Sequence, residues 1–242
     1  MNRIWFILVA SLLLLSCNKQ TPEKEVLPRT QKERVRWFEE ARLGIMIHWS
    51  LCTPAAGRFY GEKVRNSEYA EWIRCHNKVQ KADWDKMAKR MPISEKEIED
   101  WVIATKEGGF KYLTFVTKHH DGVAFWNSKV SDYTYGNLSG THFDVLKCLK
   151  EKCEKHGIVL CAYYSQWLDW GDMNGRNNDW DYADEQKTHF DRIAAGRGEI
   201  DAPYRQLPTE EAYDKYWREK AMPQVAELIK EYGVCLLYTS PS

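Results

Sequence analysis

The sequence lacks a net charge, because its 35 lysine and arginine residues are matched by 35 aspartate and glutamate residues. A balanced chain is not drawn as a whole to nucleic acid or to an acidic membrane surface, so we expect neither as a partner. It also lacks any C-x-x-C pair, which argues against a zinc ribbon or a thioredoxin-like motif, and we predict buried thiols without an essential disulfide. No internal repeat of fixed period is present, so a solenoid is not expected.

Aromatic and apolar residues are plentiful. Of 242 residues, 43% are hydrophobic and 13% aromatic, which is enough for the core of one large α/β domain or two small ones. The eleven tryptophans and thirteen tyrosines combine a flat apolar face with a polar group. Such side chains suit protein cores and sugar rings equally well.

The first 17 residues have the pattern of an export signal. A positive start at Met1-Asn2-Arg3 precedes an apolar stretch, residues 4–15, that is too short to span a bilayer as a mature helix. The sequence Leu-Ser-Cys that follows resembles the lipobox of bacterial lipoprotein signals, which implies cleavage before Cys17 and lipidation of its thiol. An ordinary secretory signal is the alternative. Residues 18–33 are polar and contain two prolines, and we expect a flexible tether there.

The most informative stretch is a short apolar strand followed by ionisable side chains. Residues 112–116 are β-branched, aromatic and apolar, as in a strand that is buried on both faces of a parallel sheet. Lys118, His119, His120 and Asp121 come next, before a glycine that permits a sharp turn. Because α/β folds keep their sites at the carboxyl ends of such strands, we predict the floor of an active site here.

Two further buried strands are predicted, at residues 43–49 and 158–164. The first ends in His48-Trp49 and the second in Tyr163-Tyr164-Ser165. Strands that alternate with helices predict right-handed crossovers and a parallel sheet. The stretches between these elements, residues 50–66, 123–141 and 172–208, are predicted to be loops on the side of the site.

Helix signals occupy the remaining stretches. We expect helices at residues 35–42 and 145–156, the latter stopped by Gly157, and a helical turn at 67–72. Asp83 is the expected N-cap of a helix through residue 91, and Ser94 with Glu97 forms a capping box for a helix that ends at Gly108-Gly109. A final helix, residues 209–232, should be interrupted at Pro223 and closed by Gly233.

Several motifs occur together and in order. They are Gly44-Ile45-Met46-Ile47-His48-Trp49, Glu71-Trp72, Thr117-Lys118-His119-His120-Asp121-Gly122, and Tyr163-Tyr164-Ser165 with Asp169-Trp170. This combination resembles the α-L-fucosidases of glycoside hydrolase family 29, over about residues 34–234. The resemblance implies a distorted (β/α)8-like TIM barrel of the α/β class with a β-sandwich behind it. It also implies retaining exo-hydrolysis of terminal α-L-fucose from glycans, without a cofactor or metal.

The resemblance also implies which side chains hold the sugar. Imidazoles and a carboxylate can bond to vicinal hydroxyl groups, and an indole can stack on the C–H face of the ring. Which of the two adjacent tyrosines faces the site is left open, although the family tends to keep the first. The chain departs from the common pattern at Ser50, where glycine is usual, and at Ile73, where an aromatic residue is usual, and both changes bear on substrate preference. The implied substrate-binding residues are His48, Glu71, Trp72, His119, His120 and Tyr163.

Retaining hydrolysis needs two carboxylates about 5 to 5.5 Å apart. The family places its nucleophilic aspartate at the end of the next strand, which should begin at Val234, with the acid/base farther on. Residues 235–242 instead read CLLYTSPS, which resembles a translated sequencing adaptor; a genuine C-terminus is the alternative. We therefore expect residues 34–234 to form the first part of the barrel, about three of its eight strands. We further expect the 242-residue chain alone to be inactive and unstable.

Two other functions remain open. A metal-dependent barrel hydrolase could use the three histidines and Asp121 as ligands, although the chain has no H-x-H or H-x-x-x-H spacing. A surface lipoprotein could bind glycans through its aromatic loops without chemistry. We assign no nucleophilic role to Asp121, which is expected to cap the turn before Gly122, or to Asp169, which is expected to lie in a loop. A fucosylated glycan is the expected partner, and the lipid anchor the only membrane contact, in a periplasmic or cell-surface protein.

Overall fold

The computed structural model describes residues 31–65, 69–176, 209–235 and 237–238. The chain divides into two compact units, residues 1–40 and 41–242. In the first unit the described element is helix α1, Gln31–Ala41, which begins earlier than expected and carries an edge-to-face contact between Trp37 and Phe38. The export signal with Cys17, and most of the expected tether, lie outside the described residues.

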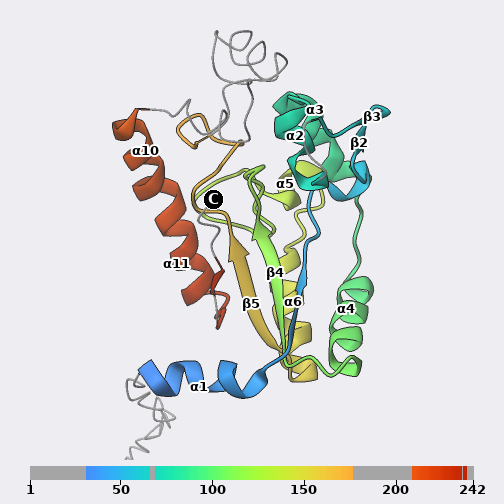
Figure 1. Ribbon diagram of the computed structural model, residues 1–242, viewed down its shortest axis with the longest axis vertical. Helices are drawn as coiled ribbons and strands as arrows, with labels where there is room; N and C mark the ends of the chain where they lie inside the picture. The colour runs from blue at the N-terminus through green and yellow to red at the C-terminus, as the bar shows by residue number, and fades with distance from the viewer. Residues whose placement is uncertain (1–30, 66–68, 177–208, 236, 239–242) are drawn as a thin grey trace, which may run out of the picture. The chain divides into compact units, whose positions relative to one another are not determined.

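A four-stranded parallel sheet forms the centre of the second unit (Figure 1). Its strands are β1 (Gly44–Ile47), β4 (Tyr112–Lys118), β5 (Val159–Tyr164) and β6 (Leu237–Tyr238), in that spatial order. The fold is therefore mixed α/β with a parallel sheet, as predicted. Strand β6 pairs with β5 at Ala162 and Tyr163, on the side where a next strand was expected. The adaptor origin of residues 235–242 stays a prediction.

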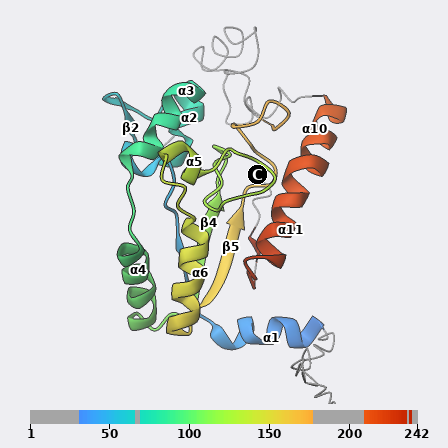
Figure 2. The same ribbon diagram turned by 180° about the vertical axis from the view of Figure 1, so that it is seen from behind.

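Two helices make the crossovers between the first three strands, and they lie side by side in Figure 2. Helix α4 (Glu95–Glu107) precedes β4, and helix α6 (Val145–His156) joins β4 to β5. The predicted capping box is confirmed, since the Ser94 side chain accepts from the Glu97 amide and Glu97 accepts from the Ser94 amide. Gly157 ends α6 as predicted, because its φ of 71° suits a residue without a side chain.

The core lies around β4, which is buried along nearly its whole length. Leu113, Phe115 and Val116 are at most 2% exposed. Each such side chain stabilises the fold by about 1.5–3 kcal/mol when it leaves water. Next to this strand Trp49 contacts the rings of Trp101, Phe125 and Tyr135 at 5.2–5.9 Å, which anchors the loop after β1 to the core.

The expected loop at residues 50–66 holds some regular structure. It contains a short 3-10 helix, η1 (Thr53–Ala55), and a hairpin of β2 (Arg58–Phe59) and β3 (Glu62–Lys63). Both residues of the hairpin turn, Tyr60 and Gly61, have positive φ, as a type I′ turn requires. Strands of two residues are too short to show an alternating pattern, so sequence periodicity does not predict them.

The expectation for Asp83 was wrong. Helix α3 (Lys81–Trp84) begins after Gln80, so Asp83 lies inside it and pairs with Lys86 at 2.6 Å. The helix gives way to a 3-10 segment, η3 (Asp85–Arg90). An aspartate near a helix start fits the first turn as well as the N-cap, because both positions favour negative charge.

Two short helices are present beyond the predicted ones, α5 and α2. A short helix, α5 (Tyr135–Ser139), lies in the expected loop at 123–141, capped by Thr134. The expected turn at 67–72 is η2 (Ala70–Trp72), followed by α2 (Ile73–His76), while residues 66–68 and 177–208 lie outside the described residues.

The last helical stretch is interrupted before its proline rather than at it. Helices α10 (Glu210–Tyr216) and α11 (Met222–Lys230) are joined by a π-helical turn, η5 (Trp217–Ala221). Pro223 crowds the carbonyl four residues earlier and cannot donate to it, and that carbonyl belongs to the wider turn.

Candidate functional site

Three strands deliver polar side chains to one edge of the sheet. His48 follows β1, His119 and His120 follow β4, and Tyr163 lies near the end of β5. The strands are parallel and paired in register, with Ile47 opposite Phe115 and Val116 opposite Tyr163. Their carboxyl ends therefore meet, as they do at the sites of α/β folds.

The histidine rings form a contiguous cluster with Tyr163. The His119 ring centre lies 4.5 Å from that of His48 and 4.0 Å from that of His120. On its other side His119 stacks on Tyr163, with ring centres 6.0 Å apart. Tyr164 points the other way: it is fully buried and donates to Gln224 at 2.8 Å. Of the two tyrosines, the first thus contacts the histidine cluster.

Adjacent residues of a strand point to opposite faces, yet His119 and His120 lie together. The reason is that β4 ends at Lys118, after a register irregularity between Val116 and Lys118. The chain then turns, with the Gly122 amide donating to the His119 carbonyl at 3.0 Å. Gly122 has a φ of 84°, and a Cβ there would overlap the Asp169 carboxylate, so no other residue fits this turn.

Trp72 closes one side of the cluster. Its indole lies 5.2 Å from the His120 ring and 5.5 Å from the Trp170 ring, and His120 and Trp170 are also 5.5 Å apart. Glu71 precedes Trp72 in η2 and is half-buried. The neighbouring Ile73 is fully buried in the core.

Hydrogen bonds define the tautomer of His120. Its Nδ1 atom lies 2.7 Å from Ser165 Oγ, and that hydroxyl donates to the Leu168 carbonyl at 2.9 Å. Because the hydroxyl has one proton, His120 must donate from Nδ1, which leaves Nε2 as an acceptor. Burial, together with the nearby Lys118 ammonium, lowers the pKa of His120 to about 3, so the ring is neutral.

The other two histidines differ in their surroundings. Burial, and then the neighbouring imidazoles, lower the pKa of His119 well below its usual value. His48 is more open to solvent, and its Nε2 lies 3.2 Å from Ser50 Oγ. Ser50 itself is buried, so its hydroxyl is a fixed partner for this ring. Neutral imidazoles of this kind can both donate to and accept from hydroxyl groups.

A buried ionic network lies under the cluster. Asp169 is fully buried and pairs with Lys118 and Lys220, each at 3.1 Å, and Lys220 also reaches Asp172 at 3.2 Å. Burial would raise the pKa of Asp169, but the two ammonium groups outweigh it and lower the pKa to about 2. Lys118 also donates to the Ser165 carbonyl at 2.7 Å, which ties the network to the partner of His120.

Asp121 has a structural role in this arrangement. Its carboxylate accepts from the Val123 amide at 3.3 Å and from the Trp84 indole at 3.2 Å, and burial raises its pKa. The Arg74 guanidinium donates to the Asp121 carbonyl at 3.1 Å. The carboxylate thus stabilises the turn after β4, as the sequence suggested.

Sequence reasoning missed the support behind the histidines. Ser165 could have been suspected from its place after a strand, next to the motif tyrosines. Lys220 and Tyr216 gave no signal, since they belong to a helical stretch about 50 residues farther along, yet both reach Asp169.

Metal binding finds no support in the described ranges. Within residues 31–65, 69–176, 209–235 and 237–238, no three His, Cys, Asp or Glu side chains are grouped so as to hold an ion. In the same ranges no helix combines the length and apolar character that crossing a membrane requires. Of the described cysteines, those at 75, 148, 153 and 161 are buried.

Comparison with known proteins shows the family to which the chain belongs. The sequence profile described as α-L-fucosidase matches residues 12–240. The chain belongs to the α-L-fucosidase family. The resemblance expected from the histidine motifs is therefore confirmed.

The chain is also similar to individual α-L-fucosidases in sequence and in structure. The bovine tissue α-L-fucosidase is 28% identical over 141 residues, which are 55% of this chain and 29% of that protein. Among solved structures, the unliganded α-L-fucosidase AlfC from Lactobacillus casei is 31% identical with a TM-score of 0.68, over 86% of this chain and 61% of the other. A family 29 α-L-fucosidase from Bacteroides thetaiotaomicron is 26% identical with a TM-score of 0.62, over 88% and 42% of the two chains. The chain thus spans about a third of its curated relatives and about three fifths of AlfC.

Proposed function

We propose that the protein containing this chain is a retaining exo-α-L-fucosidase that releases terminal fucose from glycans. The observation that carries the proposal is the cluster of His48, His119, His120, Tyr163 and Trp72 at the strand ends of a chain in this family. One mutant of L. casei AlfC has been solved with 4-nitrophenyl α-L-fucopyranoside and with Fucα(1,6)GlcNAc. Those ligands belong to that protein, and we extend the fucoside class to this one.

The geometry suits a small ring bearing hydroxyl groups. His120 offers Nε2 as an acceptor, since Nδ1 is engaged by Ser165, and its neutral state is maintained at physiological pH. Trp72 presents an indole at the edge of the cluster, where it can cover the apolar face of fucose. His48 supplies a further imidazole to the cluster, and Glu71, which directly precedes Trp72, is proposed to supply a carboxylate.

The two catalytic carboxylates are proposed to come from elsewhere in the protein. Asp121 stabilises a turn, and Asp169 is fully buried between two lysines, so neither is available to attack an anomeric carbon. In this proposal the four-stranded sheet is the first part of a (β/α)8 barrel. Closing the barrel would bring the nucleophile to the same edge of the sheet, because the carboxyl ends of all its strands face one way.

The experiment is to express the whole protein that contains this chain and follow hydrolysis of 4-nitrophenyl α-L-fucopyranoside by proton NMR. We expect α-L-fucose as the first anomer released, because a double displacement retains configuration. Release of the β-anomer would refute the retaining mechanism. Saturable fucose binding without turnover would instead favour a glycan-binding protein. Loss of turnover on chelation, with stoichiometric zinc in the purified protein, would favour a metal-dependent hydrolase.

We also propose export and lipid attachment at Cys17, on the pattern of residues 1–17. The site would then face fucosylated glycans outside the cytoplasm. Growth of the bacterial host with labelled palmitate should label the wild-type protein but not Cys17→Ser. Equal labelling of both, or of neither, would leave an ordinary secretory signal as the better reading.

A further inference from the structure

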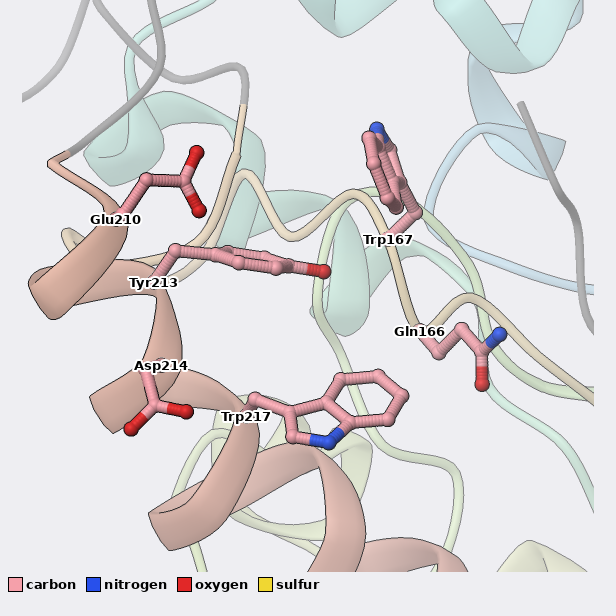
Figure 3. A pocket seen from close by; sticks show the side chains of 6 residues that line it. All are labelled: Gln166, Trp167, Glu210, Tyr213, Asp214 and Trp217. Carbon is pink, nitrogen blue, oxygen red and sulfur yellow. The ribbon is translucent and has the colours of Figure 1, made fainter.

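A hollow lies beside the segment that follows β5, and Figure 3 shows it from close by. Its volume is about 350 Å³, at the lower end of the range for small-molecule sites. One wall comes from the segment after β5 and the other from α10 and the first residue of η5. The lining residues are Gln166, Trp167, Glu210, Tyr213, Asp214 and Trp217.

Two aromatic side chains of this hollow, Trp167 and Tyr213, are held in place. The Tyr213 ring extends between the indoles of Trp167 and Trp217 in Figure 3, and its centre lies 5.9 Å from that of Trp167. The buried Arg176 guanidinium covers Trp167 at 4.1 Å and Tyr213 at 4.0 Å. Tyr213 also stacks on Tyr216 at 5.8 Å. Because the fold already orders these rings, a ligand that binds here pays less conformational entropy.

The polar side chains point to the class of ligand. Gln166 offers an amide that donates and accepts. Asp214 pairs with Arg218 at 2.7 Å and Glu210 with Arg176 at 3.5 Å, and each carboxylate keeps further acceptor lone pairs. Because these charges are balanced, the lining does not select an anionic sugar or a phosphate. Aromatic faces combined with hydrogen-bonding groups of this kind match a neutral sugar ring, which has C–H faces and hydroxyl edges.

The place of the hollow links it to the fucose site. Ser165, which bonds to His120, is followed directly by Gln166 and Trp167. Since consecutive Cα atoms are about 3.8 Å apart, the Cα of Trp167 lies within about 8 Å of that of Ser165. A glycan whose fucose occupied the histidine cluster could thus extend into the hollow.

We propose that this hollow is a subsite for the neutral hexose or N-acetylhexosamine to which the fucose is attached. The inference rests on the proposed function and deepens it. The subsite stacks that sugar on Trp217 and bonds its hydroxyl groups through Gln166 and Asp214, while Tyr213 supports one wall. It contributes to glycan recognition and takes no part in the reaction of the fucose itself.

The test compares leaving groups of different size in the whole protein. Trp217→Leu keeps apolar packing but removes the stacking surface. We expect it to lower kcat/KM for the better of Fucα(1,6)GlcNAc and 2′-fucosyllactose by about tenfold. Hydrolysis of α-L-fucosyl fluoride, whose leaving group is a single atom, should stay within about twofold of wild type. Trp217→Phe should recover most of the loss because it restores an aromatic face.

A second variant tests the subsite independently, and a third serves as a control. Gln166→Ala should show the same selective loss to a smaller degree, without touching the packing of α10. Tyr60→Ala removes an aromatic residue that is 80% exposed in the β2–β3 hairpin. It should leave kcat/KM unchanged for both the glycan and the fluoride. In both views of the ribbon this hairpin and α10 lie on opposite sides of the sheet (Figures 1 and 2).

Equal losses for the glycan and the fluoride would mean a structural role for Trp217 and would overturn the subsite. Unchanged kinetics for both substrates would overturn it too. If the wild type hydrolyses neither substrate, the proposed function has failed. Titration with N-acetylglucosamine and with galactose, followed by tryptophan fluorescence, then tests whether the hollow binds a sugar. Saturation with either sugar that Trp217→Leu abolishes would preserve a sugar site, and no saturation with both would refute it.

Discussion

Two ionic clusters in this chain use the same kinds of side chain in opposite surroundings. Between α4 and α6, Glu99 contacts Lys155 at 2.5 Å and His156 at 2.8 Å near the surface. Under the histidine cluster, Asp169 contacts Lys118 and Lys220; Asp169 and Lys118 have no exposure to solvent, and Lys220 is 8% exposed. Water therefore solvates the first cluster far more than the second. Short distances alone therefore say little about what a pair contributes.

The largest effect is expected for Asp169→Ala. This change leaves the fully buried Lys118 ammonium without a carboxylate, while Lys220 keeps Asp172 at 3.2 Å. Breaking a buried pair costs about 3–5 kcal/mol. Urea unfolding followed by circular dichroism would measure the loss of stability. A loss no larger than that of the surface variant Glu99→Ala would show that water already reaches the network.

Acid should destabilise the protein through the buried imidazoles. In the unfolded chain a histidine takes up a proton below about pH 6.5, whereas folded His120 does so only near pH 3. The unfolded state then binds more protons, so stability falls as the pH is lowered from about 6.5 to about 3. Asp169 adds to the loss at lower pH, as the pH falls from its ordinary pKa through about 2.

Urea midpoints at a series of pH values would measure this dependence. His120→Phe removes one of the titrating rings, and its stability should fall less steeply over the same interval. An identical slope in the variant would mean that His120 does not supply the pH dependence.

A smaller effect is expected for Ser165→Ala in the whole protein. The alanine removes the acceptor of the His120 Nδ1 proton, so the ring can turn and lose the orientation of Nε2. One neutral hydrogen bond of this kind corresponds to about a tenfold loss in kcat/KM for a fucoside. Ser165→Thr keeps the hydroxyl and should recover activity; failure of this rescue would indicate a packing effect instead.

The smallest effect belongs to the surface cluster. Glu99→Ala removes the partner of Lys155 and His156, but solvent and salt already weaken these pairs. We expect a slight decrease in the thermal midpoint at low salt that vanishes at 1 M NaCl. A decrease that survives high salt would show that the cluster resembles the buried one more than its exposure suggests.

The same contrast separates what the sequence could reveal from what it could not. Strands β1, β4 and β5 were predictable because their apolar runs end in polar residues, and the cap Ser94 and the stop Gly157 have local signals. Elements of two to five residues, such as the β2–β3 hairpin and α5, are too short to show a period.

Contacts between distant stretches were beyond sequence reasoning altogether. Nothing in the pattern of α10 and η5 joins Lys220 to Asp169, because that pairing exists only once the helix packs beside β5. Likewise, the position of the histidines after β4 was predictable, whereas the Ser165 hydrogen bond that sets the tautomer of His120 was not.

The most direct test of the account is His120→Ala in the whole protein, with kcat/KM for 4-nitrophenyl α-L-fucopyranoside as the readout. If neutral His120 holds a fucose hydroxyl through Nε2, its loss leaves a buried polar group of the substrate unpaired. That costs about 1–3 kcal/mol, so we expect kcat/KM to fall by about 10- to 100-fold. Turnover equal to that of the wild type would remove His120 from the site and contradict the central claim.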